Sequence, residues 1–159
     1  MQTFTSAKTS INANKLPAVS KLVNWEAYTG KTVMDYGGGK YDNLREWLLD
    51  TYDITLEVYD KYNRSEVENF RALSCSPSAI ICSNVLNVID CDETLWSIIN
   101  EMLDYGKSLY IHVYEGNRSG IGIKTMDDSW QRNMKAKDYA EFFESFNYTI
   151  KGKLITVTF

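Results

Sequence analysis

The hydrophobic and polar positions along the chain change period several times, and these changes divide it into alternating strand and helix segments. Apolar or alternating runs, which are typical of β-strands, occupy residues 32–35, 54–59, 79–82 and 109–114, with a hairpin at 148–159. Apolar residues recur at helical spacing in residues 44–52, 95–103 and 135–146, and residues 65–73 have room for a further short helix. This alternation is typical of crossover units that build a largely parallel sheet.

We therefore predict one α/β domain over residues 1–159. Its sheet has about six strands, mostly parallel, and the C-terminal hairpin that turns near Gly152 forms an antiparallel edge. Residues 115–132 are rich in Gly, Ser and charge and offer no obvious core residues. We expect them to form a functional or mobile loop.

The composition excludes several classes of protein. Hydrophobic residues make up 44% of the chain and charged residues 24%, which fits a globular domain rather than a disordered or fibrous one. No apolar run is long enough to span a membrane and residues 1–14 are not signal-like, so we expect a cytoplasmic protein without a membrane partner. The three cysteines lack C-x-x-C spacing and His112 is the only histidine, so we expect no metal site. With a net charge of −4, any nucleic-acid surface must be local.

The strongest chemical signal is a glycine run at the end of the first strand. Residues 37–39 directly follow Asp35 and Tyr36 and precede a helix, and glycine lets the backbone approach a ligand closely. Asp60 lies about twenty residues further on, where nucleotide-binding folds place an acid that accepts hydrogen bonds from ribose hydroxyls. In open α/β sheets such residues meet beyond the carboxyl ends of the strands. A glycine run by itself also fits a flexible turn.

These motifs resemble those of class I S-adenosylmethionine (SAM)-dependent methyltransferases. Residues 33–42 (VMDYGGGKYD) resemble motif I, residues 80–88 (IICSNVLNV) resemble the fourth-strand motif, and residues 58–60 end in an acid where the family binds ribose. The resemblance covers nearly the whole chain, and it extends to a bacterial and phage group in which a segment like residues 9–23 precedes motif I. It implies a Rossmann-like methyltransferase fold, with residues 1–28 as a helical segment over the cofactor side.

The resemblance also implies SAM as the cofactor, and it implies which residues contact each part of the cofactor. Asp35 and the glycines would contact its amino-acid and sugar parts, Asp60 the ribose, and Ser83 with Asn84 the methionine end. The full cofactor-binding set that we expect is Asp35, Tyr36, Gly37, Gly38, Gly39, Asp60, Lys61, Ser83 and Asn84.

Two features depart from the family pattern. Tyr41 stands in the place of the third motif I glycine. Only 18 residues, 61–78, separate Asp60 from the strand at 79–82 that carries the fourth-strand motif, so the third-strand region is shortened and its adenine-side acid has no counterpart. Binding of a nicotinamide dinucleotide is a poorer match, because Asp42 stands where the motif G-x-G-x-x-G requires its last glycine.

Methyl transfer from a sulfonium requires above all that donor and acceptor are aligned, and it requires neither a metal nor a covalent nucleophile. An acceptor that carries a proton needs a base nearby, and our candidate catalytic residues are His112, Asn84 and Tyr114. Strand alternation predicts His112 and Tyr114 on one face. The alternatives are a structurally hydrogen-bonded His112 and a capping or turn role for Asn84.

The candidate substrate-binding residues follow the same strand: Glu115, Trp130, Gln131 and Arg132. Basic residues around Trp130 could bind phosphates while the indole stacks a base, and they are Arg118, Lys124, Arg132, Lys135 and Lys137. The alternative is a solvated loop and helix start. No (Asp/Asn/Ser)-Pro-Pro-(Tyr/Phe) element follows the fourth strand, which disfavours an amino-group DNA methyltransferase.

Two functions remain open at this point. The first is a SAM-dependent methyltransferase whose methyl acceptor, a small molecule, protein or nucleic acid, is unidentified. The second is a non-catalytic methyltransferase-fold protein that binds SAM or a partner and serves a phage or mobile element. The shortened region after Asp60 and the lack of a clear catalytic acid or base motivate the second function.

Overall fold

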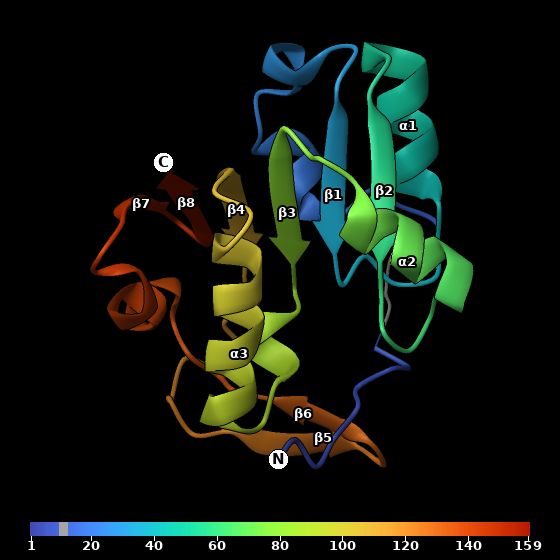
Figure 1. Ribbon diagram of the computed structural model, residues 1–159. Coiled ribbons are helices and arrows are strands. Elements are labelled where there is room, and N and C mark those ends of the chain that lie inside the picture. The colour runs from blue at the N-terminus through green and yellow to red at the C-terminus, as the bar shows by residue number, and fades with distance from the viewer. Residues whose placement is uncertain (10–12) are drawn as a thin grey trace.

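The strand that ends in the glycine run lies next to one edge of a six-stranded sheet in the computed structural model, which describes residues 1–9 and 13–159 (Figure 1). The strands of this sheet are β1 (Thr32–Tyr36), β2 (Thr55–Tyr59), β3 (Ala79–Ser83), β4 (Ser108–His112), β7 (Asn147–Lys151) and β8 (Leu154–Thr158). They are ordered β2-β1-β3-β4-β8-β7. The first four are parallel, whereas β8 pairs antiparallel with both β4 and β7. The predicted mostly parallel sheet with an antiparallel C-terminal hairpin is confirmed.

The third-strand region is shortened, as predicted. Between β2 and β3 the chain forms a single helix, α2 (Glu66–Ser74), so β2 is an edge strand. A capping box starts this helix: Ser65 Oγ accepts from the Glu68 N–H, and the Glu68 carboxylate accepts from the Ser65 N–H. The other two α-helices are α1 (Asn43–Tyr52) and α3 (Asp92–Leu103).

Four short 3₁₀ helices complete the helical elements of the described residues: η1 (Ala18–Lys21), η2 (Trp25–Tyr28), η3 (Leu86–Val88) and η4 (Ala136–Phe143). The helix predicted over 135–146 is present as η4, but it is shorter than predicted and has 3₁₀ rather than α geometry. Tyr139, Phe142 and Phe143 are buried as the pattern indicates, but they are packed from a tighter 3₁₀ turn. Aromatic spacing alone does not distinguish these two kinds of helix.

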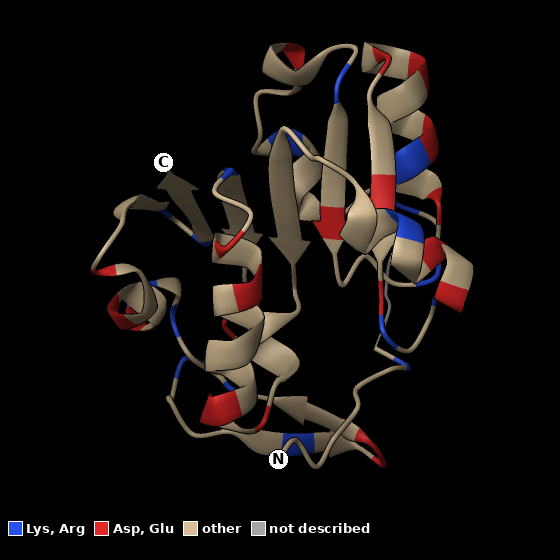
Figure 2. Cartoon of the chain, viewed as in Figure 1, with Lys and Arg blue, Asp and Glu red and all other residues tan. Residues whose placement is uncertain are grey.

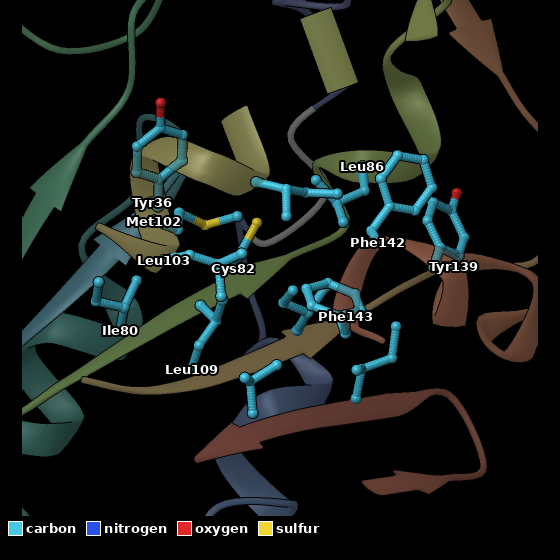
Figure 3. Close-up of a cluster of buried hydrophobic side chains, with 14 of the residues drawn as sticks. Tyr36, Ile80, Cys82, Leu86, Met102, Leu103, Leu109, Tyr139, Phe142 and Phe143 are labelled. Carbon is cyan, nitrogen blue, oxygen red and sulfur yellow. The ribbon is translucent and has the colours of Figure 1, made fainter. Parts of the chain in front are cut away.

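The core has two layers, one on each face of the sheet. On one face Val33 packs with Leu48 of α1 and with Val19 and Trp25 from η1 and η2. On the other face, Met34 and Tyr36 pack with side chains of β3, α3 and η4. Figure 3 shows Tyr36 in this layer, with Cys82 of β3 and Met102 of α3. Neighbouring β1 residues thus enter opposite layers, and the near-continuous apolar runs reflect a sheet buried on both sides.

The segment 115–132 differs from the loop that the sequence predicts. It contains a two-stranded hairpin, β5 (Ile123–Met126) and β6 (Ser129–Gln131), and several of its polar residues are buried. Hydrogen bonds explain their burial: Asn87 Nδ2 donates to Gln131 Oε1 at 3.1 Å, and Gln131 Nε2 donates to the Tyr114 carbonyl at 3.0 Å. A hydrophobic pattern cannot reveal residues buried in this way.

Residues 1–9, here called the N-terminal strap, run along this hairpin (Figure 1). The Thr5 N–H donates to Asp128 Oδ1 at 3.1 Å, the Thr3 N–H donates to Asp90 Oδ2 at 2.8 Å, and the ring of Phe4 stacks on Trp130 at 5.4 Å between centroids. The strap forms no helix but makes a turn in which the Thr9 N–H donates to the Ser6 carbonyl at 3.1 Å, and the helical turns η1 and η2 lie further along the chain. Residues 10–12, within the expected segment 1–28, lie outside the described residues.

Candidate functional site

A cavity of about 480 Å³ lies beyond the carboxyl ends of β1, β2 and β3, and we call it the strand-end cavity. Its walls come from the glycine turn, the segment after β2, the loop after β3, one face of α3 and the N-terminal strap. All nine predicted cofactor-binding residues line it: Asp35, Tyr36, Gly37, Gly38, Gly39, Asp60, Lys61, Ser83 and Asn84. The fold therefore brings together residues that are almost fifty positions apart along the chain, from Asp35 to Asn84.

The glycine turn approaches its neighbours so closely that side chains would not fit. A Cβ on Gly38 would lie 2.6 Å from both Asp35 Oδ2 and Val58 Cγ1. Gly37 has φ +80°, and a Cβ there would lie 2.3 Å from Val85 Cγ2. Tyr41, by contrast, is not among the residues with positive φ, so the third glycine of motif I is not required by the backbone here.

Two buried polar atoms in the wall of the cavity have no hydrogen-bond partner among the residues that the structure describes: Asp35 Oδ1 and Ser83 Oγ. Asp35 is the only charged residue in the central strands β1, β3 and β4, and Figure 2 shows it as the red band near the end of β1. Burial raises the pKa of Asp35 from 3.8 to about 7, against the opposing effect of the nearby Arg64. Unpaired polar groups of this kind are costly in a folded protein, and a ligand with matching donors would satisfy them.

The Asp60 carboxylate accepts several hydrogen bonds from the residues that follow it. Its Oδ1 accepts hydrogen bonds from the Tyr62 N–H and from both the N–H and the side chain of Asn63, at 2.9 to 3.1 Å. Its Oδ2 accepts from the Gly39 N–H at 2.9 Å. A carboxylate has about four acceptor positions, so Oδ2 is the oxygen with room for a further donor.

Asn84 and His112 are in contact, but they differ in their access to the cavity. Asn84 lines it, whereas His112 and Tyr114 do not. His112 is buried, and burial together with the charge of Lys153 lowers the pKa of its imidazole. Because β4 ends at His112, the predicted continuation of the strand to Tyr114 is wrong, and Tyr114 is exposed beside Lys153.

The four predicted substrate-binding residues also lie outside the strand-end cavity. Glu115 accepts from the Ala136 N–H and pairs with Arg118, and Gln131 bonds to Asn87 as described above. Arg132 is buried, donating from Nε to the Ile89 carbonyl at 2.8 Å and pairing with Asp92. Trp130 and Arg132 line a separate hollow of about 250 Å³. Arg132, one of the five residues of the expected basic cluster, is therefore buried by contacts within the protein.

Several residues of the cavity were not predicted. Helix α3 lines it with the polar residues Thr94, Ser97 and Glu101 and with Ile98, whereas Leu95 and Ile99 of the same helix are buried in the core. The spacing of these polar residues was a usable signal, because polar positions three and four apart share one helix face. The contribution of the N-terminal strap leaves no such signal. Within residues 1–9 and 13–159, no helix could span a membrane and no cluster of ligand-type side chains could hold a metal ion.

No protein-family model and no curated protein sequence matches the chain. Solved structures do match its fold. Magnesium protoporphyrin IX methyltransferase (ChlM) from Synechocystis PCC 6803, solved with bound SAM, gives a TM-score of 0.53 at 14% identity, over 89% of this chain and 78% of that chain. A chain of the Haloferax volcanii complex that contains the Trm112 methyltransferase activator gives 0.49 at 16% identity, over 79% and 67%. The DhpI–SAH complex gives 0.47 at 11%, over 88% and 80%. The sheet order and the likeness to the Synechocystis enzyme show that this chain has the Rossmann-like fold of class I methyltransferases.

Proposed function

We propose that the chain binds SAM in the strand-end cavity and transfers its methyl group to an acceptor. The observation that carries the proposal is the pair of unpartnered buried atoms, Asp35 Oδ1 and Ser83 Oγ, in a cavity floored by glycine backbone. SAM carries an ammonium and a sulfonium, and an ionised carboxylate in a buried wall attracts cationic groups of this kind. The likeness to the SAM-bound Synechocystis enzyme supports the same choice of ligand.

The residues of this chain fit the cofactor in the following way. Asp35 and Ser83 would accept and donate hydrogen bonds at its amino-acid end, and the backbone at Gly37 and Gly38 would lie against it without Cβ atoms. Asp60 would use the free side of Oδ2 for a ribose hydroxyl. Bound there, SAM supplies an electrophilic methyl group on a good leaving group.

Alignment of the acceptor is then the main task of the protein. Asn84 lines the cavity at the end of β3, where its amide would orient an acceptor. His112 contacts Asn84 from outside the cavity, so we assign it to positioning of Asn84 rather than to direct proton transfer. Tyr114, Glu115, Trp130, Gln131 and Arg132 receive no role at the cofactor from this geometry.

A second function, a SAM-binding protein without transferase activity, is favoured by one observation. Two of the three predicted catalytic residues, His112 and Tyr114, do not line the cavity. In that case the chain would bind SAM through the same residues but would release it unchanged. Binding assays therefore test the shared part of both proposals, and transfer assays separate them.

Isothermal titration calorimetry with SAM, S-adenosylhomocysteine and NAD is the first experiment. We expect saturable binding of the two adenosyl ligands and none of NAD. Ser83→Ala removes one unpartnered buried atom and should weaken binding of SAM. Tyr139→Phe is the matched control, because Tyr139 Oη is also buried and unpartnered but lies away from the cavity.

Absence of heat from SAM at millimolar concentration would overturn the proposal, as would equal effects of Ser83→Ala and Tyr139→Phe. Transfer of labelled methyl groups from SAM to fractionated cell extract then separates an enzyme from a binding protein. Labelled product would support the first function. Tight binding with no labelled product in any fraction would support the second.

A further inference from the structure

We propose that Arg64 is a positioning residue that holds the glycine loop, residues 37–42, in the shape that the cofactor requires. The proposal rests on the proposed function, because the loop that Arg64 holds forms the floor of the strand-end cavity. Arg64 itself does not line that cavity, and no motif in the sequence singles it out. Its effect on the cofactor would therefore be indirect.

The guanidinium of Arg64 is almost fully buried, with 4% of its side chain exposed. Its Nε donates to the Gly39 carbonyl at 2.7 Å and its Nη2 donates to the Tyr41 carbonyl at 3.2 Å. Its Nη1 pairs with Asp42 at 2.8 Å and with Glu68 at 3.3 Å. The planar fork of arginine thus connects three residues of the glycine loop to the first turn of α2.

Both backbone polar groups of Gly39 form hydrogen bonds to side chains. The Asp60 carboxylate accepts a hydrogen bond from the Gly39 N–H, and Arg64 donates one to the Gly39 carbonyl. The N–H groups of Gly37 and Gly38 both donate to the Tyr59 carbonyl, at 2.7 and 3.2 Å. Tyr59 at the end of β2, together with Asp60 and Arg64 in the five residues after it, therefore holds the whole glycine run.

Such support has a physical purpose. Glycine residues lose more conformational freedom on ordering than other residues, so three in succession make a loop that is costly to order when a ligand binds. Contacts already present in the free protein remove part of that cost, and ligand affinity rises as a result. The Tyr41 carbonyl, at the position of the third glycine of motif I, also accepts a hydrogen bond from Arg64 and is thereby held in place.

Arg64 also influences the charge of the cavity. Among the charged groups that face Asp35, Arg64 is the first that lowers its pKa, followed by Arg45, while Asp60 raises it. Removal of the Arg64 charge would thus make Asp35 harder to ionise. A purely mechanical role would leave the titration of Asp35 unchanged, so this second effect can be measured separately.

The test uses Arg64→Met and Arg64→Lys, with Arg71→Met as the matched control. Arg71 lies on α2 and pairs with Glu57 at 2.8 Å, but it is half exposed and outside the glycine loop. We expect Arg64→Met to weaken SAM binding roughly ten- to hundredfold, as loss of charge-assisted hydrogen bonds does. Arg64→Lys should recover part of the affinity, since it keeps the charge but not the fork, and Arg71→Met should match wild type. The pH midpoint of SAM binding should move upward in Arg64→Met and stay in place in Arg64→Lys.

Hydrogen exchange without ligand provides a readout that does not depend on SAM. We expect faster exchange of the Gly39 amide in Arg64→Lys than in wild type or Arg71→Met, even if Arg64→Met fails to fold. Wild-type exchange rates at Gly39 in Arg64→Lys would overturn the role of Arg64. Wild-type protein that binds no SAM would instead overturn the proposed function, while faster exchange would still support the loop contact.

Discussion

Asn84 and His112 are joined twice across the ends of β3 and β4. The Asn84 N–H donates to the His112 carbonyl at 2.8 Å, and Asn84 Oδ1 lies 3.2 Å from His112 Nδ1. Asn84 has φ +59°, a left-handed conformation that asparagine and glycine tolerate better than other residues. The turn that presents Asn84 to the cavity is therefore set by the backbone and by His112 together.

Two substitutions at Asn84 separate these contributions. Asn84→Gly removes the amide but keeps the left-handed backbone accessible, whereas Asn84→Ala adds strain of about 1 kcal/mol. We expect the two variants to lose SAM affinity to a similar degree. Denaturant unfolding should show Asn84→Ala to be the less stable of the two by about that amount, and equal unfolding free energies would contradict the left-handed conformation.

The buried carboxyl of Asp35 predicts an unusual dependence of stability on pH. Burial raises its pKa to about 7, so the folded protein binds this proton more tightly than the unfolded chain does. The contribution of Asp35 is therefore most favourable below about pH 4 and is lost as pH rises through about 7. Asp35→Asn should increase the free energy of unfolding by roughly 2 to 4 kcal/mol near pH 8 and by little near pH 4. A stability gain that does not change with pH would contradict this account.

The same carboxyl predicts how SAM binding varies with pH. If the ionised form of Asp35 attracts the cationic ligand, the affinity of the wild-type protein should rise as pH passes through about 7. In Asp35→Asn the affinity should be lower and should lose this rise. Calorimetric titrations across the range, with Ser83→Ala as a variant that keeps the carboxylate, provide the comparison. A rise that persists in Asp35→Asn would have to come from another group.

Gly37 and Gly30 provide a matched pair for the close approach at the cavity. Both have left-handed φ, +80° and +71°, but a Cβ on Gly30 would meet nothing within 4 Å whereas one on Gly37 would meet Val85. Both alanine variants should lose about 1 kcal/mol to backbone strain. Only Gly37→Ala should lose further stability and SAM affinity, and Val85→Ala in the same chain should restore part of both. Thermal unfolding and calorimetry would measure the difference.

The contact between Asp128 and the N-terminal strap leads to a prediction about how firmly the strap is held. Its carboxylate accepts hydrogen bonds from both the N–H and the hydroxyl of Thr5. Asp128→Ala should therefore speed proteolytic cleavage within residues 1–9 and speed release of SAM, with little change in global stability. Asp127→Ala is the neighbouring control and should behave as wild type. Equal cleavage rates in the two variants would show that Thr5 is held by other contacts.

Much of the fold could be predicted because apolar side chains determine it. The runs at β1 and β3 are buried on both faces, and the stripe on α3 faces the core, so each leaves a periodic trace in the sequence. The glycine run and Asp60 could be predicted to meet because parallel strands end at the same side of a sheet. These elements account for the location of the cavity.

The parts that escaped prediction depend on polar contacts. Gln131 and Arg132 are buried by hydrogen bonds to Asn87 and Ile89, which lie more than forty residues away. Two of the four partners of Arg64 are carbonyl oxygens of the glycine loop, and a carbonyl has no residue identity that a sequence could show. His112 was placed correctly on its strand. Alternation alone predicted neither where that strand ends nor that the His112 side chain lies outside the cavity.

The position of the N-terminal strap has a practical consequence for every experiment above. Met1 lines the strand-end cavity, so an affinity tag or fluorescent protein fused before it would emerge at the binding site and compete with the ligand. Phe159 follows β8 on the other side of the molecule, remote from the strap in Figure 1. Fusions and surface immobilisation should therefore use the carboxyl end, and a preparation that is tagged in front of Met1 should bind SAM only after the tag is cleaved.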